Sequence, residues 1–100
     1  MNIDLMDRII DALDRHNQRA TYGAVAAVVQ SSPRTLMTGR ERDQRHSWIV
    51  SRQTGQPTGY APELLHPNLT QSERVIETRV ELERWLEQFA EGVLGQLRAA

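Results

Sequence analysis

The residues that could do chemistry in this chain are few, and their spacing assembles no catalytic or metal site. His16, His46 and His66 lie far apart in expected loops, and none has a second ligand at helical spacing. The chain contains no cysteine, which excludes a thiolate nucleophile, a disulfide and a cysteine-based zinc site. Its serines lack a nucleophile-elbow motif and a positioned histidine and aspartate. We therefore expect a protein that is not an enzyme and that uses no metal and no cofactor.

Arginine is distributed unevenly along the chain. Residues 15–60 hold seven arginines against two acidic residues, whereas the segments on either side are each acidic overall. A basic centre between acidic ends is typical of a surface that faces nucleic acid. The alternative is that these arginines are ordinary solvated charges. Four of them, which we call the arginine strip, are Arg40, Arg42, Arg45 and Arg52.

Both ends of the chain have the periodicity of amphipathic helices. A helix is expected over residues 3–15, with one apolar face and a polar one. Near the other end, Thr70 and Glu73 fit a capping box, and an apolar stripe follows. This pattern predicts one long C-terminal helix over residues 71–97.

A further helix is expected after a polar loop. Thr21 stands where an N-cap residue should, because its hydroxyl can accept from the free amides of the next turn. Residues 22–29 are rich in alanine and valine, and such small side chains let a neighbouring helix approach closely.

A short helix over residues 32–38 is expected next. Ser32 is its N-cap candidate, Pro33 fits the first helical position, and Gly39 fits the left-handed residue that ends a helix. This helix would carry Arg34 near its start. Two helices joined by such a short turn indicate a helix-turn-helix over residues 21–39.

Residues 47–60 predict a small β-hairpin that would be the wing of this motif. Trp48, Ile49 and Val50 form a β-like run, and a glycine- and proline-containing turn separates it from a weak return arm that ends at Tyr60. The expected fold is therefore mainly α with a small β-hairpin: a single winged helix-turn-helix-like domain, residues 1–100, with a long C-terminal helix.

The order of these motifs resembles a known family. The run Thr21-Tyr22-Gly23-Ala24-Val25-Ala26, then Ser32-Pro33-Arg34, Gly39, His46-Ser47-Trp48-Ile49-Val50 and Gly59-Tyr60 is similar to the helix-turn-helix domain of O6-alkylguanine-DNA alkyltransferases and alkyltransferase-like proteins. The similarity covers residues 21–60. It implies a domain that faces DNA with its helix-turn-helix.

The departures from the family limit what can be transferred. The methyl-accepting cysteine is absent, so the suicide transfer reaction is excluded. Trp48 lies close to the place where alkyltransferase-like proteins have tryptophan, but the following His-Arg is missing. The intercalating arginine of the family falls on Leu36, and Arg34 replaces it only with a shift of register. The segment between Gly39 and Trp48 is too short for the family's nucleotide pocket.

We therefore expect a non-enzymatic DNA-binding module that uses the helix-turn-helix and the arginine strip, with duplex DNA as its partner. The alternative is a protein-interaction module, or a small regulatory homodimer formed through the C-terminal helix. Trp48 and Tyr60 are expected either to pack beneath the hairpin or to offer a stacking surface for a base. The candidate nucleic-acid-binding residues are Thr21, Tyr22, Ser32, Arg34, Arg40, Arg42, Arg45, Trp48 and Arg52.

The apolar runs are too short for a membrane segment. The longest, Ala24 to Val29, is far below the roughly 20 residues that a spanning helix needs. The first residues carry Asp4 and Asp7 instead of a basic segment followed by an apolar one, so no signal peptide is expected. These features lead us to expect a cytoplasmic protein.

Overall fold

The N-terminal helix forms as its periodicity predicts and supplies one wall of the core. The computed structural model of the protein describes residues 3–90, and in it α1 spans Ile3–His16. The helix buries its apolar face and leaves its aspartates outside, because apolar residues recur every three or four positions. Its buried residues are Leu5, Met6, Ile9, Ile10, Ala12 and Leu13.

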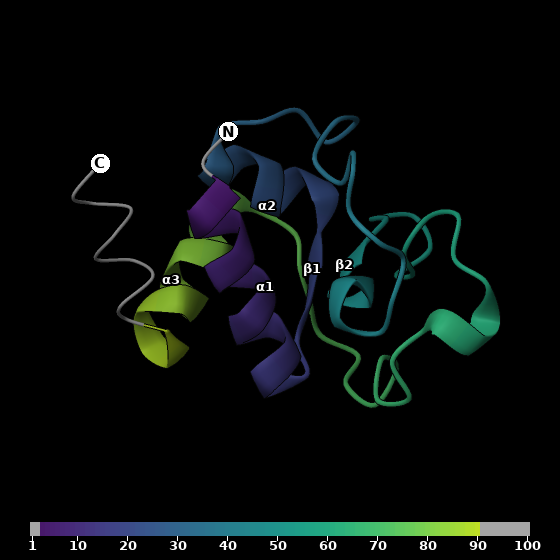
Figure 1. Cartoon of the computed structure of the whole chain (residues 1–100). Helices are drawn as coiled ribbons and strands as arrows, with labels where there is room; N and C mark the ends of the chain where they lie inside the picture. The colour runs from purple at the N-terminus through teal and green to yellow at the C-terminus, as the bar shows by residue number, and fades with distance from the viewer. Residues whose placement is uncertain (1–2, 91–100) are drawn as a thin grey trace.

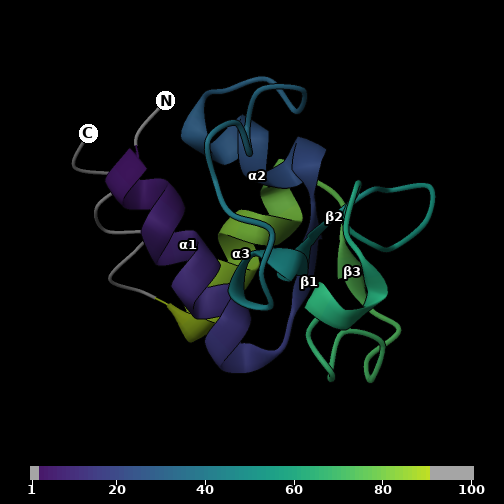
Figure 2. The same ribbon diagram turned by 45° about the vertical axis from the view of Figure 1, so that its right-hand side comes forward.

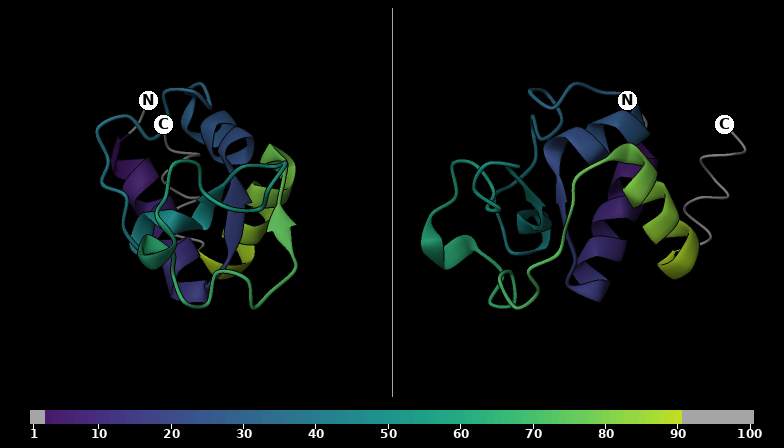
Figure 3. Two further views of the ribbon diagram at one scale, coloured as in Figure 1. Left: turned by 90° about the vertical axis from the view of Figure 1, so that its right-hand side faces the viewer. Right: turned by 180° about the vertical axis from the view of Figure 1, so that it is seen from behind.

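A small parallel sheet, which the sequence did not predict, runs through the centre of the molecule. It contains β1 (Arg19–Thr21), β2 (Ile49–Val50) and β3 (Val75–Ile76) in the order β2-β1-β3. Ala20 at the centre is in register with both Ile49 and Ile76, and all three are buried. The helices lie on one side of the molecule and the loop-rich residues 51–74 on the other (Figures 1, 2 and 3).

The second helix confirms the expected cap and boundary. α2 spans Tyr22–Val29, and the Thr21 hydroxyl accepts a hydrogen bond from the Ala24 amide at 3.1 Å. The helix ends at Gln30 in the left-handed conformation. It packs against both α1 and α3, so its alanines and valines are almost all buried.

The expected helix over residues 32–38 is wrong. Residues 33–39 instead form consecutive turns, with i to i+3 bonds from the Thr35 amide to the Ser32 carbonyl and from the Thr38 amide to the Thr35 carbonyl. The Ser32 and Thr35 hydroxyls also bond each other at 2.7 Å, and such local side-chain bonds compete with a helix. The segment buries Leu36 fully but has no further apolar turn to stabilise a helix.

The expected β-hairpin over residues 47–60 is also wrong. Ile49 and Val50 do form a strand, but it pairs parallel to β1 and has no return arm. The chain turns back at once through a tight loop, in which the Ser51 amide donates to the Gln56 carbonyl at 2.9 Å. Pro57 follows and is buried, and a proline has no N–H to donate to a ladder.

The last helix begins later than the sequence analysis predicted. α3 spans Arg79–Phe89, and Val75 and Ile76, which were expected inside a helix, form β3. The capping box is eight residues further along: the Thr78 hydroxyl accepts from the Glu81 amide at 3.1 Å. The part of the expected helix over residues 91–97 lies outside the described residues. Within residues 3–90 no helix is long and apolar enough to cross a membrane.

Thr78→Ala should lower the free energy of unfolding by about 1 kcal/mol, because it leaves the first amides of α3 without their side-chain acceptor. Thr70→Ala is the matched control. Thr70 lies in an exposed turn, and its replacement should change stability by less than about 0.5 kcal/mol. Urea unfolding of both variants tests this placement, and a larger loss for Thr70→Ala would contradict it.

Candidate functional site

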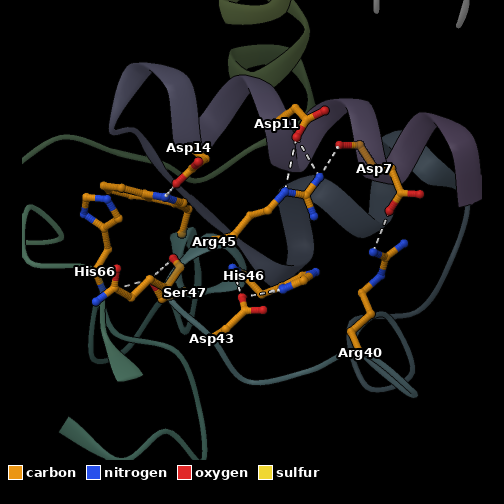
Figure 4. Close-up of polar contacts among 11 residues, drawn as sticks. Asp7, Asp11, Asp14, Arg40, Asp43, Arg45, His46, Ser47 and His66 are labelled. Atoms are coloured by element: carbon orange, nitrogen blue, oxygen red, sulfur yellow. Dashed lines mark hydrogen bonds and ion pairs between the residues drawn. The ribbon is translucent and has the colours of Figure 1, made fainter. Parts of the chain in front are cut away.

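Two arginines of the strip are already neutralised by the acidic face of α1. The Arg40 guanidinium lies 2.7 Å from an Asp7 carboxylate oxygen, and the Arg45 guanidinium lies 2.7 Å from Asp11 (Figure 4). The Arg40 side chain is only 15% exposed. That both bind phosphate stays a prediction, and these pairs make it less favourable, because each carboxylate offsets the charge that would attract another anion.

Trp48 belongs to the core and offers no stacking surface. Its side chain is fully buried, its indole N–H donates to the Asp14 carboxylate at 2.9 Å, and its ring packs on His66 with centroids 4.6 Å apart (Figure 4). Beside it, the buried Ser47 hydroxyl donates to the Gln44 carbonyl and accepts from the His66 amide. The indole is too deeply buried for any base to stack on it, so the stacking role is wrong.

Asp43 shapes the short 3-10 turn that carries these residues, η1 (Arg45–Trp48). Its carboxylate accepts from the His46 amide at 3.0 Å and lies 2.6 Å from the His46 Nδ1 (Figure 4). Burial acts to raise the pKa of the Asp43 carboxyl, but the hydrogen bonds from His46 outweigh it, and the net pKa is lowered. The carboxylate form is therefore part of the folded turn.

Of the five predicted arginines, Arg34 and Arg42 are the two without such an acidic neighbour in the part of the chain that the structure describes. Both are exposed, and within residues 3–90 neither has an acidic side chain within 4.0 Å. They line one hollow of about 490 Å³, which we call the arginine groove. Its lining residues are Tyr22, Pro33, Arg34, Met37, Thr38, Arg42 and Thr58.

A smaller pocket of about 190 Å³ adjoins the arginine groove and shares Arg42 and Tyr22 with it. His46 and Tyr60 also line this inner pocket. The Tyr60 hydroxyl is buried close to the Asp43 backbone, and burial raises the pKa of Tyr60 to about 12. That phenol therefore stays protonated and neutral at physiological pH.

The remaining predicted residues serve the fold or lie elsewhere. Thr21 caps α2 and donates to the Glu77 carbonyl, and Ser32 closes the turn with Thr35. Arg52 is 78% exposed, lies 3.9 Å from Glu77 and does not line the groove. Of the nine predicted residues, the structure brings Tyr22, Arg34 and Arg42 together in the groove.

Sequence reasoning missed several residues of this surface. Met37, Thr38 and Thr58 line the groove from turns that carry no periodic signal. His46 lines the inner pocket, whereas Trp48, which the sequence analysis selected from the same segment, does not. The pairing of Asp43 with His46, three residues apart in an expected loop, was the available signal.

Comparison of the chain with protein-family models, with curated proteins and with solved structures finds no match. The site must therefore be interpreted from its own geometry and charge.

Asp43→Asn should destabilise the protein at pH 7 and much less at pH 3. Because the folded pKa lies below the unfolded value of about 3.9, the stabilisation is present above that value and is lost as the pH falls through the folded pKa. Chemical unfolding of parent and variant across this range measures the difference. Glu41→Gln, which removes a neighbouring exposed carboxylate, is the control, and an equal pH-dependent difference in it would contradict the assignment.

Proposed function

We propose that this protein is a non-enzymatic DNA-binding module and that Arg34 and Arg42 contact the phosphate backbone of a duplex from the arginine groove. One observation carries the proposal: these two arginines have no acidic partner within residues 3–90 and line the same hollow. An unpaired guanidinium offers a planar set of donors that fits phosphate oxygens.

The resemblance to alkyltransferase-like domains supports the same choice of partner. The turns of residues 33–39 follow α2 where a helix-turn-helix would have its second helix, so this part of the chain offers no recognition helix to the major groove. Base readout is not part of the proposal, because the contacts expected from a turn and a loop are to phosphates, which carry no sequence information.

The footprint is small, and so the binding is weak and independent of sequence. Two phosphate contacts give a slope of log affinity against log salt of about −1.8, compared with about −4.5 if all five predicted arginines took part. Dissociation constants on the order of 10⁻⁴ to 10⁻⁶ M at physiological salt are typical of such binding.

An acidic protein partner is the second candidate. Pro33, Met37 and Tyr22 give the groove apolar and aromatic walls between its two arginines, a composition that is enriched at protein interfaces. The homodimer alternative relies on α3, where Val80 and Phe89 are exposed. The part of the expected C-terminal helix beyond residue 90 lies outside the described residues.

Fluorescence anisotropy of a labelled duplex at increasing salt tests the proposal. Arg34→Ala and Arg42→Ala should each weaken binding and reduce the slope by about 0.9, since each removes one phosphate contact. Arg84→Ala should leave the affinity and the salt slope unchanged. Arg84 is exposed on α3 and does not line the groove, so its replacement makes the same change in net charge away from the proposed site.

Arg45→Ala separates the groove from the arginine strip. If binding depends on the strip, this variant should lose as much affinity as Arg42→Ala, and the groove assignment is then wrong. If the parent protein does not bind duplex DNA even at low salt, DNA binding is excluded and the acidic-protein candidate takes its place.

A further inference from the structure

We infer that Gly59 is a positioning residue for Arg42, and that it presents the guanidinium to the bound phosphate. The inference rests on the proposed function, because it concerns how the same groove holds its ligand. A β-carbon at residue 59 would lie 3.3 Å from both Nε and Nη2 of Arg42 and 3.5 Å from Cζ. Both nitrogens are nearer to this position than Cζ is, so the Nε–Nη2 side of the guanidinium is the part that approaches Gly59.

Glycine is required at this position for two reasons. Its φ of +76° lies in the left-handed region, which other residues rarely adopt. In addition, contacts of 3.3 Å to a β-carbon are tighter than ordinary van der Waals contact, so a methyl group would displace the guanidinium by a few tenths of an ångström. The absence of a side chain at Gly59 therefore creates the surface on which Arg42 lies.

This surface is fixed to the rest of the fold through Tyr22. The Thr58 amide, directly before Gly59, donates to the Tyr22 hydroxyl at 2.8 Å. Tyr22 is the first residue of α2, so the turn that supports Arg42 is attached to the start of that helix. Tyr22 thus acts in the groove by holding this turn in place.

The contact has a direct consequence for anion binding. A guanidinium that lies on backbone atoms loses less side-chain entropy when a phosphate binds, and no carboxylate within residues 3–90 competes for its donors within 4.0 Å. Immobilising one long side chain in advance is worth a factor of roughly 2 to 10 in affinity.

The test compares two glycines that share the same backbone strain. Gly59→Ala and Gly39→Ala both place a side chain at a positive φ, +76° and +81°, but a β-carbon at residue 39 meets no atom within 4 Å. Both variants should therefore lose similar stability in urea. Only Gly59→Ala should weaken duplex binding, by roughly 2- to 10-fold.

A double-mutant cycle gives a readout that a purely structural role would not move. In the Arg42→Ala background, Gly59→Ala should cause no further loss of affinity, because the group that it positions is gone. NMR of the free protein supplies a second measurement. The Arg42 Nε–H signal, assigned through Arg42→Lys, should show restricted motion in the parent and in Gly39→Ala, and this restriction should disappear in Gly59→Ala.

The outcomes separate the two proposals. If the parent binds duplex DNA and Gly59→Ala binds like Gly39→Ala, or if its effect persists without Arg42, the positioning inference is wrong while the proposed function stands. If Arg42 is restricted by Gly59 in the free protein but the parent does not bind the duplex, the proposed function is wrong, and the binding role of Gly59 is excluded with it.

Discussion

Three aspartates in a row on α1 hold the central segment of the chain in place. Asp7, Asp11 and Asp14 are spaced by four and three residues, which puts them on one face of the helix. Each accepts from a different donor of residues 40–48: the Arg40 and Arg45 guanidiniums and the Trp48 indole, at 2.7, 2.7 and 2.9 Å (Figure 4). Because Trp48 leads directly into β2, this line of contacts also sets the position of the sheet's edge strand.

The same contacts explain the uneven charge along the sequence. An acidic N-terminal segment and a basic centre suggested a surface prepared for an external anion, but part of that charge is balanced within the fold. The two ion pairs to α1 are partly exposed, and each contributes only about 0 to 1 kcal/mol to stability. Their larger effect is on the local charge, since each carboxylate offsets the charge of one of the five predicted arginines.

The sequence predicted α1 and α2 because their signals lie within each helix. It missed the sheet and the start of α3 because those depend on contacts between distant parts of the chain. The periodicity of α1 and the cap at Thr21 act within one turn, so the sequence shows them directly. The sheet consists of strands of two or three residues from distant parts of the chain, too short for any alternation to be visible. Thr70 and Thr78 both begin a capping-box pattern, and pairing of Ile76 with Ala20 decides between them.

The sequence could predict that arginines form the candidate site but not which arginines do, because the fold places each arginine beside a different partner. Arg40 is paired with a carboxylate and Arg19 donates to the carbonyls of Gly55 and Ser72, so part of the donor set of each is already used. Arg42 lies beside Gly59, and no acidic side chain within residues 3–90 lies within 4.0 Å of its guanidinium. The sequence therefore shows how many arginines lie in the basic segment. Which of them can bind an anion depends on the groups that surround each guanidinium in the fold.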